Sequence, residues 1–324
     1  MQVTSRAQAV AEAAVARAPA RPRKRNFKSA SVIVLFLLPS LVLYFVFIFY
    51  PVLQAIYYSL YRWSGLGNLT DFVGMGNYLT AFKSATFLSA FFHNLVILGL
   101  SLVFQLTLSL MLALVIGKTL PGRTFFRTIF FLPYILSEVV AGFIWMFIYE
   151  PNGGLLNGAF QHLIPGFQAQ AWLGDPHMVL YSIFVAMTWK YFGLHLVLYV
   201  AAIQNIPDEV IEAARIDGAS TFQVVRLISL PLLSSTIRLT IFLSALGSLQ
   251  YFDLIWIMSG GGPVHASETM ATYLYKSGFQ SFQMGYGSAV GVIMILICFV
   301  FSIIYQRFIM RRDLAGSITS GADF

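Results

Sequence analysis

Hydrophobic positions along the chain gather into long runs that short polar segments separate. Three of these runs contain no charged residue: Ser29 to Tyr61, Ser84 to Gly117 and Ser277 to Gln306. Each run is longer than the roughly 20 residues that an α-helix needs to cross the hydrocarbon core of a bilayer. The pattern therefore predicts a membrane-spanning helix in each.

Three more apolar runs carry one interior charge apiece. They are Thr128 to Tyr149 with Glu138, Met178 to Ala202 with Lys190, and Leu239 to Met258 with Asp253. Only 10% of the residues are charged, well below the roughly 25% of a soluble domain. We therefore expect an all-α integral membrane protein with six transmembrane helices.

The basic residues predict the orientation, because Lys and Arg in short loops tend to stay in the cytoplasm. Sixteen of the twenty fall on one side: seven before Ser29, and three each within 118–127, 215–238 and 307–312. We expect both termini to be cytoplasmic, with a disordered basic tail at 1–28, a transmembrane permease domain at 29–310 and a second tail at 311–324. The start of the chain also resembles a targeting peptide in composition, but Ala18-Pro19-Ala20 precedes the apolar run, whereas a cleavage site follows it.

The cytoplasmic segment 205–231 predicts a helix, a sharp turn and a second helix. Pro207 suits the first position of a helix, and the acidic residues after it suit the positive end of the helix dipole. Gly218 can take the left-handed conformation that ends a helix. Ser220 and Gln223 have the spacing of a capping box, and Pro231 is expected to end the second helix.

This segment has two interpretations. As an amphipathic hairpin it would lie on the membrane surface. As a socket it would pass force to a cytosolic partner, because its small residues (Ala213, Ala214, Gly218 and Ala219) let another backbone come close. Three charged residues lie near these small residues: Glu212, Arg215 and Asp217.

The order of residues in this segment favours the socket. Glu212-Ala213-Ala214, three residues, Gly218, nine residues and then Ile228-x-Leu230-Pro231 resembles the EAA signature of permease subunits in bacterial ATP-binding-cassette (ABC) importers. The resemblance implies that the short helix inserts into a cleft of an ATPase subunit. It makes Glu212, Ala213, Ala214, Asp217 and Gly218 the candidate ATPase-coupling residues.

Further motifs are similar to the first permease subunit of maltose-type sugar importers. These are Gly153-x-Leu155-x-Asn157, Trp189-Lys190, Phe252-Asp253 and Ser259-Gly260-Gly261-Gly262-Pro263. The resemblance implies import of a saccharide through the bacterial inner membrane, with glycerol 3-phosphate or a polyol as the alternative. The implied partners are a different second permease subunit, two ATPase subunits that hold ATP and magnesium, and an extracytoplasmic binding protein. No cofactor is expected in this chain.

A sugar path needs aromatic side chains that stack on the apolar faces of the sugar rings and polar side chains that bind the hydroxyls. The candidates within the spans are Trp145, Trp189, Tyr191, Gln250, Tyr251, Phe252 and Asp253, with Trp256 and Asn94 in addition. Aromatic residues also form interfacial belts and pack between helices, so packing is the competing interpretation. Asp253 either lines the path or braces the glycine-rich loop that follows it.

Ionisable groups inside a membrane are costly, so each is a functional hypothesis. Glu138 and Lys190 are expected to form an interior ion pair with a structural role. His195 is expected to be a hydrogen-bonded packing residue. A channel or proton-coupled carrier that uses Glu138, Lys190 and Asp253 as a relay is the alternative from another class.

Other chemistries find little support in the sequence. Gly117-Lys118-Thr119 resembles the end of a phosphate-binding loop, but Leu112 stands where the first glycine is required. The five histidines are scattered, so we expect no metal site, and no catalytic constellation is present. The net charge of +7 follows from membrane sidedness, because the basic residues form no nucleic-acid groove.

Overall fold

The computed structural model describes residues 27–117 and 122–310. Most of the predicted N-terminal tail, the centre of the turn at 118–121 and the predicted C-terminal tail lie outside these described residues. The chain divides into two compact units, Met1–Leu53 and Gln54–Phe324, and each is described by itself.

The first predicted span is one continuous helical stretch. It consists of α2 (Phe27–Tyr44), η1 (Phe45–Phe49) and α3 (Tyr50–Tyr58), so it crosses the boundary between the two units. Its described side chains from Val34 onward make a 25-residue candidate span of mean hydropathy 2.3. The prediction of a spanning helix here is confirmed.

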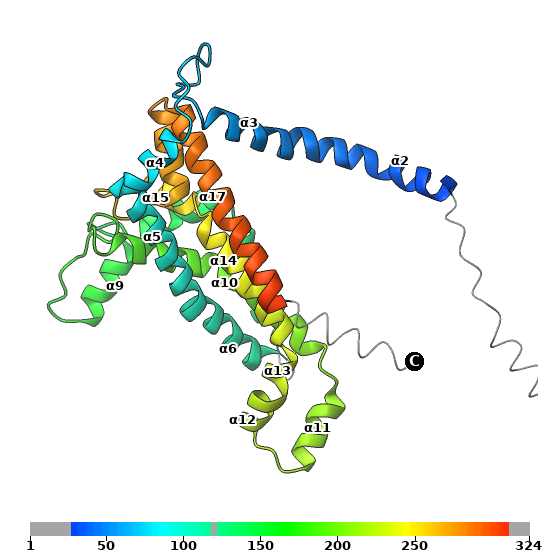
Figure 1. Cartoon of the computed structure of the whole chain (residues 1–324). Helices are drawn as coiled ribbons and strands as arrows, with labels where there is room; N and C mark the ends of the chain where they lie inside the picture. The colour runs from blue at the N-terminus through cyan, green and yellow to red at the C-terminus, as the bar shows by residue number, and fades with distance from the viewer. Residues whose placement is uncertain (1–26, 118–121, 311–324) are drawn as a thin grey trace, which may run out of the picture. The chain divides into compact units, whose positions relative to one another are not determined.

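The second unit contains four more helices that are long and apolar enough to span a membrane (Figure 1). They are α5 (Ala85–Leu100) with η2 (Ser101–Gln105) and α6 (Leu106–Ile116); α10 (Val179–Gln204); α14 (Ser234–Leu249) with α15 (Asp253–Met258); and α17 (Met284–Tyr305) with η5 (Gln306–Met310). These four stretches match the second, fourth, fifth and sixth predicted spans.

The third predicted span is not one straight helix. Residues 123–148 form α7 (Arg123–Ile135) and α8 (Glu138–Ile148), which are bent by 99° at the break between them. Pro133 lies near the end of α7, and proline destabilises a helix because it lacks an N–H donor. Ser137 then starts α8 by accepting a hydrogen bond from the Val140 N–H. The described residues therefore hold five candidate spans, or six if the bent pair counts as one.

The last span begins later than its apolar run suggests. Residues 276–280 form a separate element, η4, and α17 starts only at Met284. Phe282, between these two elements, has a φ of +53°, a left-handed conformation that no helix of L-residues continues through. The prediction that this span starts at Ser277 is wrong. Shorter helices precede it or stand between the other spans: α4 (Gly76–Lys83), α9 (Leu155–Leu163) and α16 (Met270–Tyr275).

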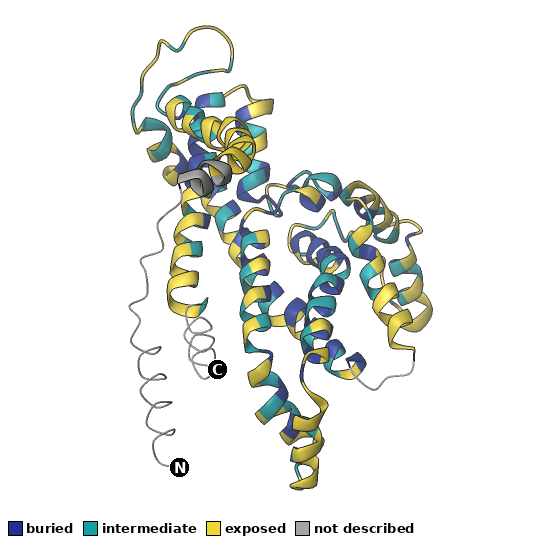
Figure 2. Cartoon of the chain, turned by 90° about the vertical axis from the view of Figure 1, so that its right-hand side faces the viewer, coloured by how far each residue is buried: buried dark blue, intermediate teal, exposed yellow. Residues whose placement is uncertain are grey.

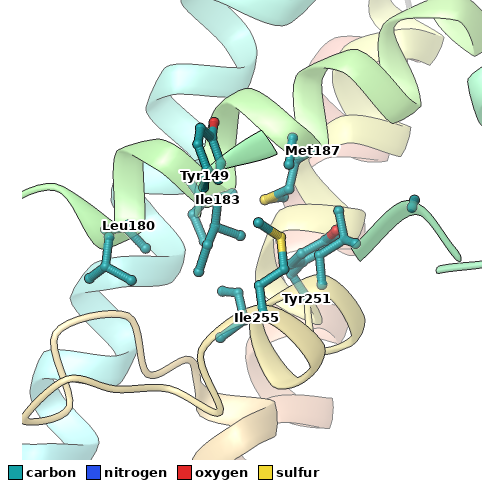
Figure 3. Close-up of a cluster of buried hydrophobic side chains, with 12 residues drawn as sticks. Tyr149, Leu180, Ile183, Met187, Tyr251 and Ile255 are labelled. Carbon is teal, nitrogen blue, oxygen red and sulfur yellow. The ribbon is translucent and has the colours of Figure 1, made fainter. Parts of the chain in front are cut away.

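Buried residues gather where the helices of the second unit cross, and exposed residues cover their outer faces (Figure 2). The largest buried cluster joins α8, α10 and α15 and includes Tyr149, Ile183, Met187, Tyr251 and Ile255 (Figure 3). Many large apolar side chains stay exposed in the isolated chain. Such surfaces suit contact with lipid and with other membrane subunits.

One glycine sets the distance between α7 and α10. A Cβ atom at Gly193 would lie 2.0 Å from the Phe130 carbonyl oxygen and 3.1 Å from the Phe131 Cα. Only glycine lets the two backbones approach this closely, as is common at helix contacts within membranes. The glycine therefore holds the first half of the broken span against α10.

Gly193→Ala is expected to lower the free energy of unfolding by about 1–3 kcal/mol, because the added methyl group forces α7 away from α10. The measurement is the thermal unfolding of the purified chain in detergent. Gly99→Ala in α5 is the matched control, since a Cβ there meets no atom within 4 Å. Equal stability of the two variants would show that the α7–α10 contact does not depend on the glycine.

Candidate functional site

The predicted cytoplasmic segment folds as two short helices around a glycine. The first is α11 (Asp208–Ile216), and the second begins as α12 (Thr221–Val224). Gly218 has a φ of +83°, which confirms the predicted left-handed turn. The capping box is also confirmed, because the Gln223 N–H donates to Ser220 Oγ and the Ser220 N–H donates to Gln223 Oε1.

The end of the second helix differs from the prediction. The helical path continues from α12 through η3 (Val225–Ser229) and α13 (Leu230–Leu232), so it does not stop at Pro231. Pro231 is the second residue of α13, directly after the π-helical turn η3. Pro207 also sits one position earlier than predicted, as the residue that caps α11.

The five candidate coupling residues lie on or beside this turn, at one end of the second unit (Figure 1). Glu212, Ala213, Asp217 and Gly218 are exposed, and Ala214 is half-buried. Two large apolar side chains flank the turn and are also exposed, Ile216 at 86% and Phe222 at 70%. The turn thus presents small, charged and apolar groups together on one surface.

The base of this segment is anchored in the helices above it. Ile206 and Leu233 are buried in a cluster with Leu196, Tyr199 and other residues of α10, and Ile211 of α11 packs against that cluster. Packed side chains therefore join the base of the exposed turn to α10 and α14.

The predicted interior ion pair is confirmed, and it lies at the break of the third span. Lys190 Nζ is 3.5 Å from Glu138 Oε1, and the Lys190 side chain is only 3% exposed. The same ammonium donates to the Leu136 carbonyl oxygen at 2.6 Å and to the Tyr134 carbonyl oxygen at 3.5 Å. These carbonyls lie at the C-terminal end of α7, and Glu138 is the first residue of α8.

This arrangement matches the charge of each helix end. The C-terminus of a helix carries partial negative charge and the N-terminus partial positive charge. Lys190 therefore stabilises the end of α7 and Glu138 the start of α8. The Tyr191 hydroxyl donates a hydrogen bond to Glu138 Oε1 as well, which links α10 to both halves of the broken span.

The structure brings four of the seven substrate-path candidates to one cluster. The Trp145 and Trp189 rings meet edge to face with centroids 5.9 Å apart, and the Tyr191 and Tyr251 rings do the same at 6.1 Å. All four border or belong to the cluster of Figure 3. The Trp145 Nε1 and Tyr251 hydroxyl groups are buried without a hydrogen-bond partner among the described residues.

The other three candidates do not belong to this cluster and lie between the end of α14 and the start of α15. Gln250 is exposed and lines a cavity of about 600 Å³ between α14, α16 and α17, where its Nε2 donates to Cys298 Sγ at 3.3 Å. Phe252 stacks on Trp256 with ring centroids 5.7 Å apart. Asp253 is exposed in the first turn of α15, with its carboxylate near Tyr191 and Tyr251. The seven residues therefore do not converge on one pocket.

Asn94 and His195 are both buried, but they differ in their hydrogen bonds. Asn94 is fully buried and uses both amide atoms, donating to the Ser248 carbonyl and accepting from the Met270 N–H, so it ties α5 to α14 and α16. His195 is buried, but neither ring nitrogen has a hydrogen-bond partner in the described part of the chain. It packs as expected, and the prediction that it is hydrogen-bonded is wrong.

The chain resembles known transport proteins in sequence and in fold. Residues 105–313 match the family model described as "Binding-protein-dependent transport system inner membrane component". The chain belongs to this family. It is 31% identical to the diacetylchitobiose uptake system permease protein NgcF of Streptomyces coelicolor, over 91% of this chain and 87% of the relative. It is 32% identical to the sn-glycerol-3-phosphate transport system permease protein UgpA of Rhizobium meliloti, over 85% and 93% respectively.

The fold of the permease also matches a solved transporter. A chain in the crystal structure of a bacterial alginate ABC transporter, in complex with an alginate pentasaccharide-bound periplasmic protein, superposes with a TM-score of 0.78. The match covers 90% of the permease and 98% of that chain, at 23% identity. By its family the permease is a multi-pass inner-membrane subunit of an ABC importer. The solved transporter shares its all-α fold.

Two polar centres of the permease were missed in the sequence. Asn157 is buried, and its amide bonds the Pro151 and Gln170 carbonyls, the Gln170 N–H and Trp172 Nε1. The glycine-x-leucine-x-asparagine motif therefore organises its own loop. Glu268 is 1% exposed and pairs with Lys276 Nζ at 3.1 Å and with His265. Glu268 stands among small and polar residues, Ala266-Ser267-Glu268-Thr269, so the sequence carried no clear signal for this second centre.

Proposed function

We propose that this permease carries a neutral saccharide across the inner membrane, after an extracytoplasmic binding protein has delivered it. A different permease subunit forms the other half of the path, and two ATPase subunits drive the cycle with ATP and magnesium. Both termini and the turn at Gly218 face the cytoplasm. The relative named for diacetylchitobiose uptake supports the saccharide, and the relative named for sn-glycerol-3-phosphate transport supports the alternative.

The charges along the candidate path favour a neutral saccharide over sn-glycerol 3-phosphate as the substrate. The path residues and their neighbours include two carboxylates, Glu138 and Asp253. The cation among them, Lys190, is buried and bound to Glu138 and to helix carbonyls. A phosphate ester needs a cationic site, which Arg or Lys usually supplies. A neutral sugar instead needs ring faces and hydrogen bonds, which Trp145, Trp189 and Tyr191 and their neighbours offer.

The test is uptake into liposomes that hold the complete complex. With binding protein outside and ATP inside, we expect import of a saccharide such as N,N′-diacetylchitobiose or maltotriose and no import of sn-glycerol 3-phosphate. Liposomes that contain the permease alone are the control, and they should transport none of these compounds. Uptake by the permease alone would instead favour a channel or proton-coupled carrier. Import of the phosphate ester alone would contradict the saccharide assignment.

In this function the turn at Gly218 is the contact site for the ATPases. Ile216 and Phe222 are exposed beside it, and exposed apolar groups rimmed by charge are typical of protein interfaces. The EAA-like order of Glu212, Ala213 and Gly218 supports the same partner. Because the turn is packed onto α10 and α14 at its base, movement of the ATPases would reach the spans that carry the path.

A further inference from the structure

A second cavity, which none of the path candidates lines, lies between the loop after α3 and the start of α17. Its volume is about 600 Å³, within the roughly 300–1,000 Å³ of small-molecule sites. Residues of 62–80 line one side, and Phe282, Gln283 and Tyr286 line the other. It belongs to the end of the second unit where α4 lies, opposite α11 and α12 (Figure 1). In the proposed topology this end faces the outside of the cell.

The walls of this cavity are fixed to each other by backbone contacts. The Gly285 N–H donates to the Trp63 carbonyl oxygen at 2.9 Å, and a Cβ at Gly285 would lie 2.0 Å from the Tyr61 carbonyl oxygen. On the other side, Asn77 Nδ2 donates to the carbonyl oxygens of Ser59 and Tyr61. The loop therefore rests directly on the first turn of α17, and the cavity is preformed.

Two aromatic side chains stand at this cavity in constrained positions. The Trp63 indole is held by a hydrogen bond from its Nε1 to the Gly67 carbonyl and by ring contact with Tyr58 at 4.7 Å. Phe282 is 62% exposed and has a φ of +53°. A bulky residue rarely adopts this conformation, and such strained residues cluster at functional sites. The fold thus keeps an exposed aromatic ring at the cavity at an energetic cost.

The polar lining suits hydroxyl groups more than charge. Asn68 and Gln283 line the cavity, and within the described residues no hydrogen bond occupies their side-chain amides. Each amide offers donors and an acceptor. Arg62, the charged residue of the lining, is 3.5 Å from Asp71, which offsets its charge. An anion would therefore gain little here.

We propose that this cavity is an accessory saccharide site on the outer face of the permease, in which Trp63 and Phe282 stack on the sugar ring and Asn68 and Gln283 bond its hydroxyls. The inference rests on the proposed saccharide specificity. The site holds one end of the sugar as it leaves the binding protein, before the sugar enters the membrane path.

The test is saturation-transfer NMR on the complete permease–ATPase complex in nanodiscs, without binding protein. The probes are N,N′-diacetylchitobiose, maltotriose and sn-glycerol 3-phosphate at millimolar concentration. We expect transfer to the ring protons of at least one saccharide and none to the phosphate ester. Trp63→Ala and Asn68→Ala should each weaken this binding about tenfold, a loss of about 1.4 kcal/mol. Leu79→Ala is the control, because Leu79 is exposed on α4 but does not line the cavity.

Two outcomes would overturn the inference. Absence of saccharide transfer in the wild-type complex is one, and equal transfer in the wild type and in Asn68→Ala is another. Asn68 is an exposed loop residue, so misfolding would not explain a loss in its variant. If saccharide transfer is absent, weaker docking of the binding protein to the Trp63→Ala variant would identify the cavity as a protein contact. Failure of the proposed function is a separate result, namely import of sn-glycerol 3-phosphate in place of a saccharide by the complete system.

Discussion

A permease that carries Glu212→Ala together with Gly218→Pro is expected to lose import while the ATPases still hydrolyse ATP. Gly218 has a φ of +83°, whereas proline fixes φ near −65°, so the turn between α11 and α12 cannot keep its shape. Glu212 is exposed, so its removal changes only the surface offered to a partner. We expect substrate uptake into liposomes to fall at least about a hundredfold, the equivalent of about 2.7 kcal/mol of lost coupling.

The controls separate lost coupling from lost folding. Ile206 and Leu233 anchor the segment and are unchanged, so the double variant should insert into membranes and purify in normal yield. Glu209→Ala removes a nearby exposed carboxylate outside the motif and should import at the wild-type rate. Normal uptake by the double variant would show that the turn does not transmit work from the ATPases.

The spans were predictable because lipid imposes one rule along the whole sequence. A charge-free run such as Ser84 to Gly117 has no other stable structure at that length, and the observed helical stretch Ala85–Ile116 differs from it by one residue at each end. The turn at Gly218 was predictable for a local reason, since glycine and the Ser220–Gln223 pair specify their own backbone geometry.

The bend in the third span depends on long-range contacts, so the apolar pattern did not reveal it. Residues 128–149 form an apolar run with one charged residue, Glu138. A hydropathy pattern does not report the direction of the helix axis, so it does not reveal a bend. Pro133 and Ser137 carried the local signal, which predicts a break but not the angle of 99°. The angle is held from α10, about 55 residues along the chain, by Lys190 and Gly193.

The substrate path was harder to predict for a different reason. The same aromatic residue types line substrate paths and pack protein cores. Only their neighbours in the structure distinguish the two roles. Trp189 and Phe252 each precede a charged residue within a predicted span. The Trp189 ring contacts Trp145, whereas the Phe252 ring contacts Trp256, so the two residues lie in different aromatic clusters. Asn94 resembled a binding residue until its two backbone partners were visible.

Lys190→Met is expected to lower the free energy of unfolding by about 3 kcal/mol or more, because removal of one partner from a buried ion pair leaves the other charge uncompensated. Glu138 is 25% exposed and would keep only the Tyr191 hydroxyl as a partner at Oε1, and the carbonyls at the end of α7 would lose their donor. The measurement is thermal or denaturant unfolding of the purified chain in detergent. Lys83→Met, at the exposed end of α4, should change stability by no more than about 0.5 kcal/mol.

A double-mutant cycle separates the two roles of Lys190. Glu138→Gln keeps the shape of the side chain and removes its charge, so the combination with Lys190→Met leaves no unpaired carboxylate. The double variant should therefore lose less stability than the sum of the single variants, by about 1 kcal/mol or more. The remaining loss measures what the ammonium contributes by binding the Leu136 carbonyl at 2.6 Å. Strict additivity would contradict the ion pair as a stabilising contact and would leave the bend dependent on the helix-end carbonyls and on Gly193.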